Sequence, residues 1–225
     1  MRKIILASSS PRRAELLQQI GLPFDICVRP VDEFCLPGLA PHALVEVLAA
    51  RKAAAAAKTA GEGLVIGADT VVVWQEQVLG KPGNENEAMQ MLQKLSGDTH
   101  AVYTGVALLD PAAGRSLVRH EKTRVRFKRL EEDEIRRYVA TGEPLDKSGG
   151  YAPTMYRLNE SSKSLRGSLK EENSLPKGTG KAGAYAIQGI GALFVERIEG
   201  DYTNVVGLPL CLLGKMLKEF GVNIP

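Results

Sequence analysis

The chain has few cysteines and no long apolar run. Its three cysteines, Cys27, Cys35 and Cys211, are odd in number and widely spaced, which excludes a disulfide framework and a zinc site with paired cysteine ligands. We expect them to be reduced thiols in the core. No apolar run approaches the roughly 20 residues that a membrane-spanning helix needs, and a strand pattern begins by Ile4, which leaves no room for a signal peptide. These absences predict a cytoplasmic protein with no membrane partner.

The charge pattern gives little support to a nucleic-acid-binding protein. The formal net charge is +3, a mild excess that favours phosphorylated ligands but does not demand nucleic acid. Lys122, Arg124, Arg126 and Lys128 alternate along an expected strand with Thr123, Val125 and Phe127, but no aromatic side chain interleaves with them on the basic face. A solvated sheet face explains this stripe better, so we expect no nucleic-acid partner.

The first motif joins a strand to a helix. The apolar run Ile4–Leu6 is followed by Ala-Ser-Ser-Ser-Pro-Arg-Arg at 7–13, in which Ser10 suits a helix N-cap and Pro11 the first helical position. Backbone N–H groups, serine hydroxyls and the guanidinium groups of Arg12 and Arg13 converge there with the positive end of the helix dipole. The pattern predicts a phosphate site, although an ordinary capped helix with solvated arginines explains the segment equally well.

Helix and strand patterns then alternate along the chain. The expected helices are 11–19, 41–60, 84–95, 131–141 and 209–220, and the expected strands are 24–28, 64–74, 78–82, 100–109, 117–127 and 192–198. The organisation breaks after Gly142. Lys-Ser-Gly-Gly-Tyr-Ala at 147–152 and Lys-Ala-Gly-Ala-Tyr-Ala at 181–186 nearly repeat one another, and the tract between them is polar, which is typical of a mobile surface loop. We therefore expect a single domain over 1–225 with a polar insertion at about 152–181.

Asp69 stands inside an apolar strand pattern. Leu64–Ala68 precedes it and Thr70–Trp74 follows it, and both segments are almost wholly apolar. A buried carboxylate is costly unless it is paired with a cation or bound to a metal. An aspartate that merely caps a turn is a weaker interpretation because apolar residues flank it on both sides. Asp69 is therefore the best candidate for a functional carboxylate.

The other charged residues of interest suit phosphate chemistry. The chain has no Walker loop and no Ser/His/Asp motif, and we expect the isolated His42, His100 and His120 to be incidental. Cations that bind phosphate and hard oxygen ligands for Mg²⁺ or Mn²⁺, without a covalent nucleophile, favour metal-assisted attack of water on a phosphoanhydride. The candidates are Arg12, Arg13, Lys52, Lys81, Glu33 and Asp69.

Motifs in order along the chain resemble those of the Maf family of nucleoside triphosphate pyrophosphatases. They are Ser-Ser-Ser-Pro-Arg-Arg at 8–13, Val-Asp-Glu at 31–33, Lys52, Gly-Ala-Asp-Thr at 67–70, Gly-Lys-Pro at 80–82, Leu-Ser-Gly-x-x-His at 95–100, Glu-Pro-Leu-Asp-Lys at 143–147 and Val-Val-Gly-Leu-Pro at 205–209. The resemblance implies an α/β fold like that of inosine triphosphatases, with a mixed elongated sheet flanked by helices and two lobes around a central cleft. It also implies hydrolysis of a nucleoside triphosphate to monophosphate and pyrophosphate, house-cleaning of the nucleotide pool and a link to cell-division arrest.

The same resemblance assigns roles to single residues. Asp69 would be the catalytic acid that accepts a proton from water or holds a metal, and Glu33 would assist with a divalent cation. Ser8, Arg13, Lys52 and Lys81 would bind the triphosphate. Asp69-Thr70 and the later Ile-Gln-Gly at 187–189 are similar to the dTTP/UTP branch, in which Arg12, Thr70 and Gln188 would set base choice.

The insertion splits the later motif and leaves alternatives open. Either Lys147 or Lys181 takes the family position, and we expect Gln188 to keep its role while the tract bulges from the rim of the cleft. Two other functions compete: a pyrophosphatase for modified or purine nucleotides, and a nucleotide-binding regulator whose insertion has impaired catalysis. The expected partner is a nucleoside triphosphate, and a homodimer is compatible with the resemblance.

Overall fold

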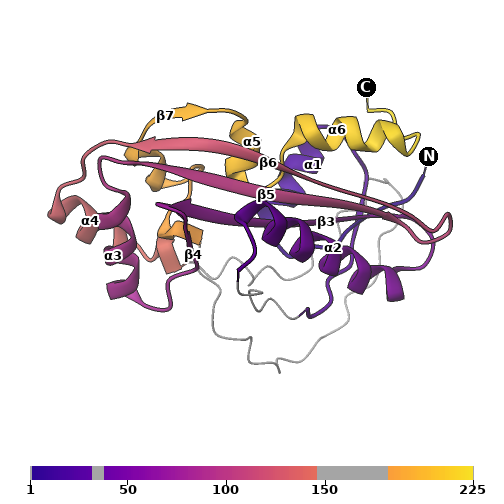
Figure 1. Ribbon diagram of the computed structural model, residues 1–225, viewed down its shortest axis with the longest axis horizontal. Coiled ribbons are helices and arrows are strands. Elements are labelled where there is room, and N and C mark those ends of the chain that lie inside the picture. The colour runs from indigo at the N-terminus through magenta and orange to yellow at the C-terminus, as the bar shows by residue number, and fades with distance from the viewer. Residues whose placement is uncertain (1, 32–37, 146–181, 225) are drawn as a thin grey trace, which may run out of the picture.

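A computed structural model describes residues 2–31, 38–145 and 182–224, and its centre is one mixed β-sheet (Figure 1). The strand order is β2-β1-β3-β5-β6-β7, with β4 paired to β3. Glu33, Lys147, Lys181 and the tract at 152–181 lie outside the described residues, so the predictions made for them stay predictions. The strands are β1 (Ile4–Leu6), β2 (Asp25–Ile26), β3 (Leu64–Trp74), β4 (Gln77–Leu79), β5 (Thr99–Asp110), β6 (Arg115–Phe127) and β7 (Val195–Glu199).

The strands are parallel at one side of the sheet and antiparallel at the other. β1 runs parallel to β2 and to β3. The pairs β3–β5, β5–β6 and β6–β7 are all antiparallel. The helices are α1 (Pro11–Gln19), α2 (Pro41–Ala60), α3 (Glu85–Leu95), α4 (Glu132–Ala140), α5 (Tyr202–Val206) and α6 (Leu210–Glu219), with 3₁₀ helices η1 (Glu143–Leu145), η2 (Ala182–Ala184) and η3 (Ile190–Phe194). Figure 1 shows α3 and α4 at one end of the long strands and α6 with both chain termini toward the other. The predicted mixed sheet flanked by helices is confirmed. No helix within the described ranges is both long and apolar enough to cross a membrane.

Helix α2 packs with its backbone directly on one face of the sheet. A Cβ atom added at Gly67 of β3 would lie 2.2 Å from the carbonyl oxygen of Ala49, and one added at Gly105 of β5 would lie 2.2 Å from that of Val45. Both glycines are required because any side chain would occupy the space of the helix backbone. This contact fixes α2 over the middle of β3, and Lys52 lies three residues after Ala49 on the same helix.

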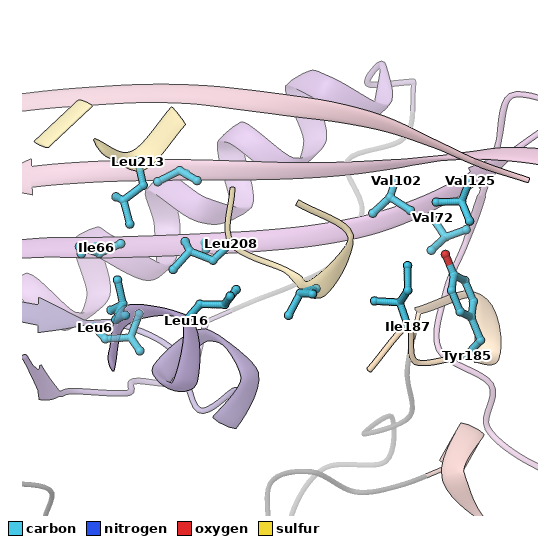
Figure 2. Packing of buried hydrophobic residues seen from close by; sticks show 14 of the residues in the cluster. Leu6, Leu16, Ile66, Val72, Val102, Val125, Tyr185, Ile187, Leu208 and Leu213 are labelled. Atoms are coloured by element: carbon cyan, nitrogen blue, oxygen red, sulfur yellow. The ribbon is translucent and has the colours of Figure 1, made fainter. Parts of the chain in front are cut away.

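The other face of the sheet carries the main apolar core. Figure 2 shows Leu16 of α1, Leu208 between α5 and α6, and Leu213 of α6 near Ile66 at one end. At the other end, Tyr185 and Ile187 lie beside Val72, Val102 and Val125. The segment that follows the undescribed tract is therefore part of the core, because Ala184, Tyr185, Ala186 and Ile187 are all buried.

Several local predictions were wrong. Residues 190–194 form η3, so the last strand begins at Val195 and not at 192, and the helix α5 had no predicted counterpart. Ser10 occupies the N-cap position of α1, but its side chain makes no capping hydrogen bond. Cys27 is half-buried and Cys211 is exposed, so neither is a core thiol. These errors arise where burial depends on tertiary packing, which a local pattern does not contain.

His100, which we expected to be incidental, is a buried structural residue. Its Nε2 atom lies 2.9 Å from the Tyr185 hydroxyl, and its ring packs edge-on against Phe127. The side chain is 2% exposed, and burial lowers the pKa of His100 to about 4. His100 thus anchors the segment that leads to Gln188 as a neutral imidazole.

Replacing His100 with Gln is expected to reduce the acid sensitivity of folding. Below its ordinary pKa of 6.5 the unfolded chain binds a proton that the folded chain takes up only near pH 4. The wild-type protein should therefore lose roughly 3 kcal/mol of unfolding free energy between these pH values through this group alone. Urea unfolding of both proteins at pH 7, 6, 5 and 4 checks this. Parallel stability curves for the two proteins would contradict it.

Candidate active site

The candidate site lies where one edge of β3 has no strand partner. β1 pairs with Leu64–Ile66 and β4 pairs with Val72–Trp74 on this edge, so between them 67–71 have no strand partner on this edge among the described residues, while β5 pairs with them on the other edge. Asp69 and Thr70 lie in this gap, just past the carboxyl end of β1. Successive residues of a strand point to opposite faces of the sheet, so these two side chains lie on different faces.

Asp69 lies on the face covered by α2 and is paired with Lys52. The Lys52 Nζ atom donates to Asp69 Oδ1 at 2.6 Å, and the side chains are 17% and 13% exposed respectively. The contact of α2 with Gly67 brings the lysine to this carboxylate. The structure thus pairs the buried carboxylate with Lys52, which the sequence resemblance had assigned to the triphosphate, and each charge compensates the other in a setting where either alone would be costly.

Arg13 lies on the opposite face, where its guanidinium donates to three oxygens. Nε donates to the carbonyl of Gly207 at 2.8 Å, Nη1 to Ser8 Oγ at 3.0 Å and Nη2 to Thr70 Oγ1 at 3.1 Å. Arg13 and Ser8 are buried, at 9% and 6% exposure. The chain from β1 into α1 is thus held to β3 by a rigid planar group. Ser8 also accepts a hydrogen bond from the backbone N–H of Ser10.

Sequence reasoning missed the residues that continue this network across the sheet. Thr70 Oγ1 lies 2.9 Å from Thr104 Oγ1, and Thr104 donates to the carbonyl of Asn204 at 3.0 Å. The Asn204 amide is fully buried and donates to the carbonyl of Val102 and to Thr123 Oγ1. The only sequence signal nearby was the Val-Val-Gly-Leu-Pro motif, whose Gly207 carbonyl the structure shows to be an acceptor for Arg13.

Lys81 and Gln188 lie toward the β4 side of the gap. Both side chains are exposed. β4 ends at Leu79, opposite Val72, and Lys81 follows two residues later. The backbone N–H of Gly183 donates to the carbonyl of Gly80 at 3.2 Å, which attaches the segment leading to Gln188 beside Lys81.

The structure thus brings the predicted residues together in separate groups. Lys52 meets Asp69 on one face, Ser8 and Arg13 meet Thr70 on the other, and the cleft between two lobes stays a prediction. The remaining residues are the half-buried Arg12 on α1, the exposed Lys81 and Gln188, and Glu33, which lies outside the described ranges.

The carboxylates of the candidate site fit a divalent cation only if oxygens of a bound substrate complete its coordination. Within the described ranges no group of three or more His, Cys, Asp or Glu side chains could hold a metal ion. Mg²⁺ is commonly bound by one or two carboxylates together with substrate phosphates and water. Asp69, with Glu33 as the second predicted carboxylate, matches that pattern.

Comparison with known proteins decides the family. The family model described as "Maf-like protein" matches residues 3–170 and 161–220. The chain belongs to the Maf family. The two matched ranges of the Maf model overlap at 161–170, within the tract predicted to be an insertion.

Curated relatives match this Maf chain over its whole length. A protein of Pelotomaculum thermopropionicum named dTTP/UTP pyrophosphatase is 51% identical over 224 residues, covering 100% of both chains. Proteins of the same name from Desulforamulus reducens and Moorella thermoacetica are 45% and 46% identical, covering 100% of this chain and 100% and 98% of their own. The predicted resemblance to the Maf family and to its dTTP/UTP branch is confirmed.

Solved structures give weaker similarities to this Maf protein. The Ham1 protein of Staphylococcus aureus is similar with a TM-score of 0.39 and 17% identity, over 56% of this chain and 72% of that one. A HAM1 protein of Coxiella burnetii gives a TM-score of 0.42 and 17% identity, over 58% and 75%.

Proposed function

We propose that this Maf protein hydrolyses dTTP and UTP to the nucleoside monophosphate and pyrophosphate. The observation that carries the proposal is the Lys52–Asp69 pair at the unpaired edge of β3. The Asp69 carboxylate, held by Lys52, offers a proton acceptor. Arg13, on the opposite face of β3, adds positive charge for a triphosphate. The names of the full-length relatives support the same substrates.

In the proposed reaction a water molecule attacks the α-phosphorus of the triphosphate. The water oxygen bonds to this phosphorus, its proton passes to the Asp69 carboxylate, and the bond to the bridging oxygen breaks so that pyrophosphate leaves. Lys52 holds the carboxylate in place through its 2.6 Å contact. We assign Lys81, which is exposed beyond β4, to the departing phosphates.

A divalent cation, Mg²⁺ or Mn²⁺, would be held by Asp69 and Glu33 together with phosphate oxygens. When bound, it would neutralise phosphate charge and increase the acidity of the attacking water.

Base selection is assigned to the face that carries Thr70. Gln188 is exposed and offers an amide that can donate to and accept from a base edge. Thr70 already contacts Arg13 and Thr104, so we assign it an indirect role, in which it orients Arg13. Arg12, two residues after the end of the serine run, is the further candidate for contact with the nucleotide.

A panel of nucleoside triphosphates tests the proposal. With Mg²⁺ present, we expect kcat/KM for dTTP and UTP to exceed that for purine triphosphates by about 10-fold or more, because a wrong base leaves buried polar groups unpaired. Pyrophosphate and monophosphate should appear in equal amounts, and EDTA should abolish turnover. A purine or modified-base preference would favour the broader pyrophosphatase, and nucleotide binding without turnover would favour the regulator.

A further inference from the structure

Glu143, which the sequence offered only as part of a family motif, accepts three hydrogen bonds from Tyr138, Ile190 and Gly191 within the described part of the chain. The Tyr138 hydroxyl donates to its Oε1 atom at 2.8 Å, the backbone N–H of Ile190 to Oε2 at 2.9 Å and that of Gly191 to Oε1 at 3.2 Å. Glu143 begins η1, and the two N–H groups belong to the start of η3. The carboxylate therefore joins two segments that stand on opposite sides of the undescribed tract.

The surroundings of this carboxylate are closely packed. A Cβ atom added at Gly189 would lie 2.4 Å from Glu143 Oε2, so any side chain there would displace the carboxylate from its present position. Tyr138 is 2% exposed, and burial, with Glu143 beside it, raises the pKa of its hydroxyl. The hydroxyl thus stays protonated and keeps donating to Glu143.

The residues held by this arrangement enclose Gln188 from both sides. Ile187 is buried beside Val72 and Tyr185 in the core (Figure 2). The backbone N–H of Gly189 donates to the carbonyl of Ala186 at 3.2 Å, which closes a turn around Gln188. Gln188 itself is exposed, between a residue fixed by the core and residues fixed by Glu143.

We propose that Glu143 is a positioning residue for Gln188, so that the base-selecting amide depends on the carboxylate on the far side of the tract. The inference rests on the proposed function, since it assigns Gln188 to the nucleotide. An uncharged Gln at 143 would set an NH₂ group against a backbone N–H group, which removes one of the three acceptor contacts. The turn would then lose its fixed position while Asp69 and Lys52 stay as they are.

The test compares Glu143→Gln, Gln188→Ala and the double variant by steady-state kinetics on dTTP and dGTP. We expect each single change to lower kcat/KM for dTTP by about 10-fold and to affect dGTP far less, so that the selectivity ratio falls. The double variant should be no worse than Gln188→Ala alone, because Glu143 acts through that residue. Independent, multiplying losses would overturn the proposal, as would an equal loss on both nucleotides.

Two further variants separate positioning from folding. Glu134→Gln on the neighbouring α4 changes a carboxylate that pairs with Lys128 at the surface, and it should leave both kinetic constants unchanged. Tyr138→Phe removes one donor to Glu143 and should lower dTTP selectivity in the same direction but less. If Glu143→Gln does not fold, as judged by circular dichroism, Tyr138→Phe decides, and unchanged selectivity there would overturn the proposal.

Binding measurements keep the two proposals apart. If the wild-type protein binds dTTP without hydrolysing it, the proposed function fails, and the dissociation constants of the same variants for dTTP and dGTP replace the kinetic constants. Positioning is supported if Glu143→Gln binds dTTP more weakly than the wild type while the double variant binds dTTP as tightly as Gln188→Ala alone. Unchanged affinity in Glu143→Gln overturns it.

Discussion

Asp69→Asn is expected to lower kcat/KM for dTTP by about a thousandfold, the usual scale of losing a general base. The amide has the shape of the carboxylate but accepts no proton, and it removes the negative charge that Lys52 contacts at 2.6 Å in a site where the lysine is 17% exposed. Pyrophosphate release by the purified variant, with circular dichroism to confirm folding, measures the effect.

Asp110→Asn is the matched control for this experiment. Asp110 is also a buried aspartate of the sheet, and it is paired with Arg2 and not with a residue of the site. The change should cost some stability while activity stays near that of the wild type. Wild-type turnover in Asp69→Asn, or an equal loss in Asp110→Asn, would refute the assigned role of Asp69.

The second large effect is expected from Gly67→Ala, which should destabilise the fold by about 3 kcal/mol or more. The new Cβ atom would lie 2.2 Å from the Ala49 carbonyl oxygen and 2.8 Å from the Ala53 backbone nitrogen, so α2 has to move off the sheet. For a chain of this size the melting temperature should fall by roughly 6–12 °C. Thermal and urea unfolding measure the loss.

Gly214→Ala gives the control for glycine replacement. Gly214 lies inside α6, and nothing would come within 4 Å of an added Cβ atom. Alanine is the better helix former, so this variant should match or exceed wild-type stability by up to about 1 kcal/mol. Equal destabilisation by both replacements would show that the contact of α2 with Gly67 is not the cause.

The site could be predicted from sequence where its signal was local. A charged residue inside an apolar strand pattern indicated Asp69, and Lys52 was one of the candidate cations that the sequence named. Because side chains alternate along a strand, Asp69 and Thr70 must lie on opposite faces of the sheet. The expectation of one central cleft did not take this into account. Element types were predictable for the same reason, because the long helices and strands carry their periodicity in consecutive residues.

The remaining contacts depend on register and on distant segments. Thr104 meets Thr70 only because β3 and β5 pair with these residues opposite one another. Glu143 at the start of η1 accepts from the backbone of Ile190 at the start of η3, across 47 positions of sequence. The residues near Thr70 and Glu143 do not indicate which distant residue each one contacts. Sequence patterns could therefore identify the motifs but not these hydrogen bonds.

The division of the site between the two faces of β3 makes the enzyme modular. Asp69 and Lys52 are set by the packing of α2, whereas Thr70, Arg13 and the Gln188 segment are set by the core on the other side. With the proposed roles, changes at Gln188 should retune which base is accepted without moving Asp69 and Lys52, which are assigned to hydrolysis on the other face. A library aimed at new nucleotide specificity should therefore vary the Gln188 segment and keep Arg13, which is assigned to the triphosphate.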